Sequence, residues 1–168
     1  MGMAKKEWKA LKTLLIVGEG YHDEAFLNHV KRLPGACGNG VKITIKNAHG
    51  KGALNVINYA ERLSMNFGYD HVAALFDADT DWTPETAERA KRAKIQVLLS
   101  SPCLEALLLR CLGKRPATSD PLKAQLAHYV GNAPGKPESY ATYFSLPSLR
   151  AVRAQESTID DLLSLFNL

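Results

Sequence analysis

The apolar residues of this chain fall into short runs, and each run is followed by a stretch with helical spacing. Strand-length runs occupy residues 13–17, 41–45, 72–76 and 95–99. Helical stretches follow them at about residues 21–33, 53–65, 83–94 and 103–112. A strand that alternates with a helix in this way predicts an α/β fold with a four-stranded, mainly parallel sheet that helices flank on both faces.

The pattern changes beyond Gly113. Helices are expected at about residues 121–130 and 147–154, and a capping-box sequence at Ser157-Thr158-Ile159-Asp160 predicts a last helix with an apolar face. A separate domain of this size would be marginally stable. We therefore expect a basic N-terminal segment over residues 1–12, an α/β domain over 13–112, and a short helical C-terminal extension over 113–168 that packs on the same domain.

Composition and charge narrow the possible environments and ligands. None of the apolar runs approaches the about 20 residues that a membrane span needs, and three cysteines (Cys37, Cys103 and Cys111) do not suggest a disulfide framework. A cytoplasmic protein without a membrane partner is the expectation. The net charge is +4, with basic residues concentrated near both ends and most of the notable acids in the middle. This distribution suits a polyanionic ligand held over a metal site.

Four acids follow strands or open helices at the same expected edge of the sheet. Asp77 and Asp79 come directly after the run at 72–76, Glu19 follows the first strand, and Glu105 opens an otherwise apolar helix. Right-handed crossovers place all strand carboxyl ends along one edge. Clustered carboxylates repel one another unless a cation neutralises them, and oxygen ligands of this kind suit Mg²⁺ or Mn²⁺. Taken singly, each acid also fits a turn or a helix N-terminus.

A glycine-rich segment, His49-Gly50-Lys51-Gly52, follows the second strand at the same edge. Its glycines allow a close approach of the backbone, and His49 or Lys51 is placed to contact a phosphate. A turn with a solvated lysine accounts for the same residues equally well.

The acid motifs resemble those of the Toprim superfamily, the metal-dependent catalytic module of topoisomerases, primases and OLD-type nucleases. A narrower similarity is to its RloB-like branch, where an EG…TE…F opening is followed by fDxD and then by SxPcxExWLL. The matching segments are Glu19-Gly20-Tyr21-His22-Asp23-Glu24-Ala25-Phe26, Phe76-Asp77-Ala78-Asp79 and Ser100-Ser101-Pro102-Cys103-Leu104-Glu105-Ala106-Leu107-Leu108-Leu109. Two positions depart from the pattern: Asp23 replaces the usual Thr before Glu24, and Leu107 replaces an aromatic residue. Neither is an expected ligand.

The resemblance implies a Toprim-like catalytic domain over residues 13–112 and a Mg²⁺- or Mn²⁺-dependent nuclease that hydrolyses phosphodiesters of DNA or RNA. Asp77, Asp79 and Glu105 would hold one or two metal ions, and Glu19 would be a further ligand or a general acid/base. The resemblance also implies a phage-defence or mobile-element context, with a separately encoded ABC- or OLD-type ATPase as a candidate partner.

Two alternatives remain at this point. Leu75-Phe76-Asp77-Ala78-Asp79-Thr80 also fits the opening motif of HAD phosphatases, with Asp77 as nucleophile and Asp79 as acid/base, Ser100 in the second motif, and Asp160-Asp161 as the last acidic pair. Against it, about seventy residues precede the motif and the pair lies within an expected helix. The other alternative is an adaptor with the Toprim fold that binds nucleic acid or nucleotide without cleavage.

Overall fold

A single four-stranded sheet forms the centre of the computed structural model, which describes residues 12–36, 38, 40–79, 81–118 and 121–168. The strands are β1 (Lys12–Gly18), β2 (Val41–Asn47), β3 (His71–Asp77) and β4 (Ile95–Ser100). Their order is β2-β1-β3-β4, and every neighbouring pair is parallel. The α/β fold predicted from the alternating pattern is therefore confirmed, and the sheet is parallel throughout.

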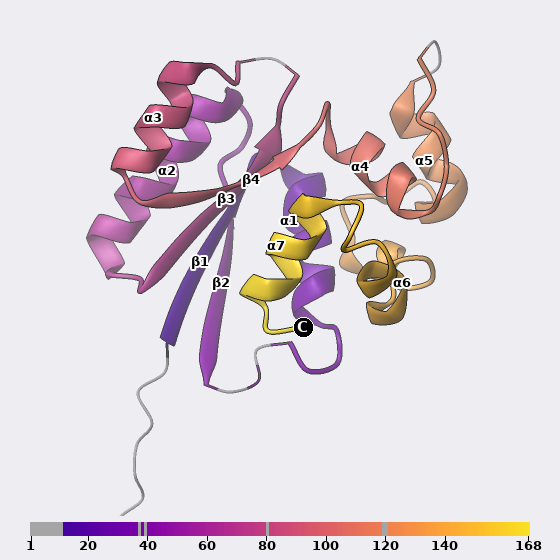
Figure 1. Ribbon diagram of the computed structural model, residues 1–168, viewed down its shortest axis with the longest axis horizontal. Coiled ribbons are helices and arrows are strands. Elements are labelled where there is room, and N and C mark those ends of the chain that lie inside the picture. Colours follow the sequence, from indigo (N-terminus) through magenta and orange to yellow (C-terminus); the bar gives the residue numbers. More distant parts are fainter. Residues whose placement is uncertain (1–11, 37, 39, 80, 119–120) are drawn as a thin grey trace, which may run out of the picture.

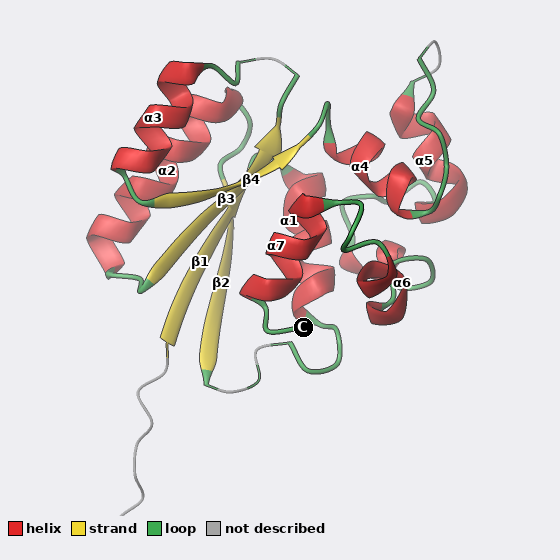
Figure 2. Ribbon diagram, in the orientation of Figure 1, coloured by secondary structure: helices red, strands yellow, loops and turns green. Residues whose placement is uncertain are grey.

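Helices cover both faces of this sheet, as Figures 1 and 2 show. The pair α2 (Gly52–Phe67) and α3 (Pro84–Arg92) lies on one face, and α1 (Tyr21–Lys31) and α7 (Ser157–Leu165) lie on the other. The remaining helices extend from the latter side: α4 (Leu104–Cys111), α5 (Leu122–Val130), the 3₁₀ helix η1 (Pro137–Tyr140) and α6 (Leu146–Ala151). All predicted helices are present, and η1 is the one helix in the described ranges that the pattern did not predict.

The strands separate two hydrophobic cores. Leu14 and Ile16 of β1 belong to the core under α1 and the C-terminal helices, whereas Leu15 and Val17 belong to the core under α2. Successive side chains of a strand point to opposite faces, so an unbroken apolar run is what a strand covered on both faces requires. This explains why residues 14–17 and 72–76 include no polar residue.

The C-terminal extension packs into the first of these cores. Tyr140 and Phe144 are fully buried, and their rings contact Phe26 edge-on at centroid distances of 5.6 and 6.0 Å. The buried ring of His29 also contacts the extension, with Nε2 2.7 Å from the carbonyl oxygen of Phe144. Burial lowers the pKa of His29, so the neutral ring donates this hydrogen bond. The helices after residue 113 therefore share a hydrophobic core with the sheet.

Local details differ from the sequence-based expectation at two helices. Leu54, an apolar residue of the helix predicted at about residues 53–65, is 46% exposed. In α7 the N-cap is Glu156, and Ser157 is the first helical residue, so the predicted capping box does not form. Thr83, at the start of the helix predicted at about residues 83–94, caps α3, because its side chain accepts a hydrogen bond from Thr86 N–H. The basic segment over residues 1–12 lies outside the described residues except for Lys12.

Backbone hydrogen bonds tie together the loops at the carboxyl edge of the sheet. The N–H of Glu19 donates to the carbonyl of Leu75 (3.1 Å), and the N–H of Ala78 donates to those of Ser100 and Pro102 (2.9 and 3.1 Å). The segments that follow β1, β3 and β4 are therefore fixed against one another. Within the described part of the chain, none of the helices is both long and apolar enough to cross a bilayer.

Candidate functional site

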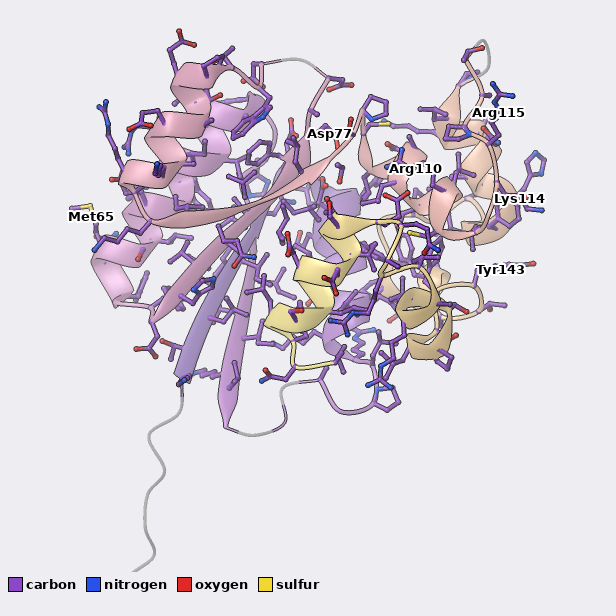
Figure 3. All side chains as sticks on the ribbon, in the orientation of Figure 1. Met65, Asp77, Arg110, Lys114, Arg115 and Tyr143 are labelled. Carbon is purple, nitrogen blue, oxygen red and sulfur yellow. The ribbon has the colours of Figure 1, made fainter. Side chains whose placement is uncertain are left out.

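A hollow of about 470 Å³ lies at the carboxyl edge of the sheet, between the end of β3 and the helices α1, α4 and α5. Three of the four predicted acids line it: Asp77, Asp79 and Glu105. Figure 3 shows Asp77 at this end of the sheet, on the side from which α4 and α5 extend. The acids therefore come from different βα units, and the parallel sheet brings them to one place.

Asp77 is held from two directions. Its Oδ1 accepts a hydrogen bond from the backbone N–H of Leu104 (2.9 Å), at the first turn of α4. Its own N–H donates to Oε2 of Glu19 (3.1 Å), which attaches the fourth predicted acid to the cluster. The pKa of Asp77 is raised to about 7, mainly by partial burial and also by the charges of Glu19, Glu105 and Asp79, while the Leu104 hydrogen bond lowers it.

Asp23 is a fifth acid in the site, and the sequence analysis did not include it among the ligands. Its side chain is only 7% exposed and lines the same hollow. Oδ2 accepts a hydrogen bond from Gly20 N–H (3.1 Å), whereas the buried Oδ1 has no hydrogen-bond partner. Burial, followed by the charges of Asp77 and Glu19, raises the pKa of Asp23 to about 8. An unpartnered buried oxygen beside other carboxylates is a position that a cation would satisfy.

The neighbouring Glu24 does not take part in the cluster. Its Oε2 accepts a hydrogen bond from the side chain of Asn47 at the end of β2 (3.0 Å). The resemblance places its glutamate at Glu24 and treats Asp23 as a departure, but the helical turn of α1 directs Asp23 into the hollow. The sequence signal that could have identified Asp23 is its position in the first turn of a helix that begins at the carboxyl edge of the sheet.

Glu105 and two basic side chains lie along the α5 side of the hollow. Glu105 is 9% exposed, and its Oε1 lies 3.7 Å from Nδ1 of His22. Lys123, an exposed residue of α5, also lines the hollow. His22 and Lys123 were not predicted as site residues, because a single basic residue in a helix has no distinguishing sequence signal.

The donor set fits a hard divalent cation. Within the described residues, Glu19, Asp23, Asp77 and Asp79 have no Lys or Arg ion pair, so the protein itself does not neutralise them. Burial raises the pKa of the nearby Cys103 thiol to about 11, which disfavours a thiolate ligand and leaves oxygen donors. Among the side chains that are described, no group of three or more acids, histidines or cysteines is arranged so that it could hold a metal ion. The five acids, Glu19, Asp23, Asp77, Asp79 and Glu105, lie around the open hollow and are called here the ring.

The predicted phosphate-contacting loop lies beside this ring. The N–H of Gly50 donates to the carbonyl of Glu19 (2.7 Å), and the His49 ring packs edge-on against Tyr21 at 5.7 Å. His49 and Lys51 are exposed, have positive φ angles of 60° and 69°, and are not among the residues that line the hollow. The N-terminus of α2 is capped by Asp81, which accepts from Ala53 N–H at 2.9 Å. Phosphate contact by His49 or Lys51 stays a prediction.

The structure does not bring Asp160 and Asp161 to Asp77. Asp160 accepts a hydrogen bond from Arg153 at 2.7 Å, and Asp161 lines a different cavity with Lys12 and His71, which begin β1 and β3. The residues that a HAD phosphatase would need as its last acidic pair are therefore not part of this site. No family model, curated protein or solved structure matches the chain in the three comparisons made with known proteins.

Gly18 is required by the close approach of α1 to the end of β1. A Cβ at this position would lie 2.9 Å from Cβ of Asp23 and 3.2 Å from the backbone nitrogen of Glu24. We expect Gly18→Ala to displace the first turn of α1, lower the free energy of unfolding by about 1–3 kcal/mol, and weaken metal binding. Chemical denaturation and metal titration measure the two effects.

Gly20→Ala is the matched control for this prediction. Gly20 has an extended backbone, with φ of −140°, and an added Cβ would meet only Oδ2 of Asp23 at 3.8 Å. Its N–H, which Asp23 needs, is retained in alanine. Equal stability and metal affinity in the two variants would contradict the packing argument.

Proposed function

We propose that this protein is a Mg²⁺- or Mn²⁺-dependent Toprim-like nuclease that hydrolyses phosphodiester bonds in nucleic acid. The observation that carries the proposal is the convergence of four carboxylates on one hollow, with Glu19 attached to them through the N–H of Asp77 and a buried, unpartnered oxygen on Asp23. Among the described residues, no lysine or arginine is ion-paired with Glu19, Asp23, Asp77 or Asp79. Such an arrangement is costly unless a cation is bound.

Each acid has a distinct part in holding the cation. Asp77 is the central ligand, because the N–H of Leu104 fixes its carboxylate and Glu19 accepts from its backbone. Asp23 offers its buried, unpartnered Oδ1 as a ligand. Glu105 from α4 and the exposed Asp79 from the loop after β3 complete the ring. When bound, the metal ion would activate a water for attack and neutralise charge on the phosphoryl oxygens.

Positive side chains around the ring would receive the substrate backbone. Lys123 lines the hollow itself, and His49 and Lys51 flank it on the β2 side. Arg110, Lys114 and Arg115 lie on the α4–α5 side of the molecule (Figure 3), where Arg110 is ion-paired with Glu156. Contacts of this kind bind phosphates without reading sequence. We propose DNA or RNA as the ligand on this ground.

The test combines metal binding with cleavage. The purified full chain is titrated with Mn²⁺ by electron paramagnetic resonance, and is incubated with single- and double-stranded DNA and RNA in Mg²⁺, Mn²⁺, Ca²⁺ or EDTA. We expect Mn²⁺ binding at one or two sites and cleavage in Mg²⁺ or Mn²⁺ only. Metal and nucleic-acid binding without cleavage would support the adaptor alternative, and the absence of metal binding would overturn the proposal.

A further inference from the structure

A second cavity adjoins the acidic hollow. It has a volume of about 260 Å³ and lies between α4 and α5, closed by the segment after α5 and by Tyr140. Four residues line both cavities: His22, Leu104, Glu105 and Lys123. A ligand that extends from the acids towards α5 would therefore enter this second cavity, called here the α5 cavity.

The lining of the α5 cavity differs in chemistry from that of the hollow. Its α5 wall consists of apolar side chains, among them Leu126, Ala127 and Val130. Tyr140 contributes its ring, while its hydroxyl donates to the carbonyl of Pro134 (2.7 Å). Polar groups are few: Asn132 joins the shared His22, Glu105 and Lys123. An apolar cavity with a few convergent polar groups is typical of a site for a small, flat organic group.

We propose that the α5 cavity binds an unpaired nucleobase of the strand whose phosphodiester lies at the acids. This inference rests on the proposed function and names its substrate class, a single-stranded nucleic acid. A phosphate would not enter an apolar cavity beside Glu105. A base fits because its faces are apolar and its edge carries hydrogen-bonding groups, and enzymes read an unstacked base in this way.

The proposal distinguishes single strands from duplexes. A base in a duplex must be unpaired and unstacked before it can enter a cavity, which costs a few kcal/mol, whereas a single strand offers its bases freely. Cleavage should therefore be faster for single-stranded substrates than for duplexes of the same sequence. DNA and RNA share adenine, guanine and cytosine, so DNA and RNA single strands of the same A, G and C sequence, assayed side by side, identify which of them the protein uses.

The experiment fills the cavity and measures two independent properties. Ala127→Phe places a ring in the α5 cavity, and Ala124→Phe does so from an exposed position on the same wall. Ala87→Phe is the matched control, because Ala87 is also a half-buried helical alanine but lies on α3, across the sheet. Circular dichroism and thermal unfolding establish which variants fold.

Nucleoside binding is measured without metal, by titrating adenosine, guanosine, cytidine and uridine, with ribose as the control sugar. We expect binding of at least one nucleoside by the wild type and by Ala87→Phe, a loss of at least 10-fold in Ala124→Phe and in Ala127→Phe, and no response to ribose. Absence of nucleoside binding by the wild type, or equal binding by the folded cavity variants, overturns the proposal.

Cleavage of a single strand with one abasic residue at successive positions gives the second readout. We expect one position at which the abasic residue slows the wild type at least 10-fold and has no further effect in Ala124→Phe. Normal cleavage of every abasic strand overturns the base pocket and leaves the nuclease proposal standing. Nucleoside binding without cleavage of any strand has the opposite meaning: the nuclease proposal fails and the base-binding cavity remains.

Discussion

Replacing Asp77 with asparagine should lower the rate of metal-dependent cleavage about 1000-fold or more while the protein stays folded. Asparagine has the same shape and retains a side-chain oxygen for the N–H of Leu104, but it removes one negative charge from the centre of the ring. A loss of about 4 kcal/mol in transition-state stabilisation corresponds to this factor, and metal-assisted charge neutralisation is worth that much. Initial rates in Mg²⁺ and Mn²⁺, with Mn²⁺ affinity measured alongside, test the expectation.

Asp161→Asn is the matched control, because it makes the same chemical change at an exposed acid that lines a different cavity. We expect wild-type cleavage from it. Unfolding measurements without metal separate a folding defect from a chemical one: Asp77→Asn should be at least as stable as the wild type, because burial and the neighbouring acids already raise the pKa of Asp77 to about 7. Retained cleavage in folded Asp77→Asn would remove Asp77 from the site.

The second large effect is expected at Asp23, where metal binding and stability should change in opposite directions. Asp23→Asn keeps an acceptor for Gly20 N–H and removes the buried charge. Without metal, the variant should be more stable than the wild type at pH 8, because the unfolded wild type gains free energy by ionising a carboxyl whose pKa burial raises in the folded chain, and asparagine does not ionise. Its Mn²⁺ affinity should fall about 10-fold or more, because metal-supporting groups contribute on that scale.

The stability of the metal-free wild type should also depend on pH. Below the ordinary value of 3.8 the Asp23 carboxyl is protonated in both the folded and the unfolded chain, and it carries no penalty. Between 3.8 and the raised pKa of about 8, the unfolded chain loses the proton and the folded chain retains it. The free energy of unfolding therefore falls as pH rises through this window.

Denaturant titrations from pH 5 to 9, with and without Mg²⁺, measure this slope. We expect it to be smaller in Asp23→Asn and to be offset by Mg²⁺ in the wild type, most strongly at high pH. Glu88→Gln on exposed α3 is the matched control and should retain the wild-type slope. The same slope in the wild type and in Asp23→Asn would show that Asp23 is not the titrating group.

Much of the architecture follows from the pattern of apolar residues. Residues 14–17 and 72–76 are apolar throughout because both faces of their strands are covered, and such unbroken apolar runs are typical of a buried parallel sheet. Thr83 and Pro84 mark the start of α3 because capping is a local interaction. The exposure of Leu54 and the position of Ser157 inside α7 were less predictable. The first depends on how the whole helix packs, and the second on where the helix begins.

The features of the candidate site also fall into two groups, those that the sequence predicts and those that depend on packing. The order of strands and helices along the chain was enough to predict the sheet, the edge at which its strands end, and the presence of Glu19, Asp77, Asp79 and Glu105 at that edge. Tertiary packing, by contrast, determines that Asp23 enters the cluster while Glu24 turns away to Asn47. It likewise decided that an apolar cavity adjoins Glu105. The physical reason is that side-chain direction and burial depend on how α1 and α5 pack against the sheet and α4, and those contacts join residues far apart in the sequence.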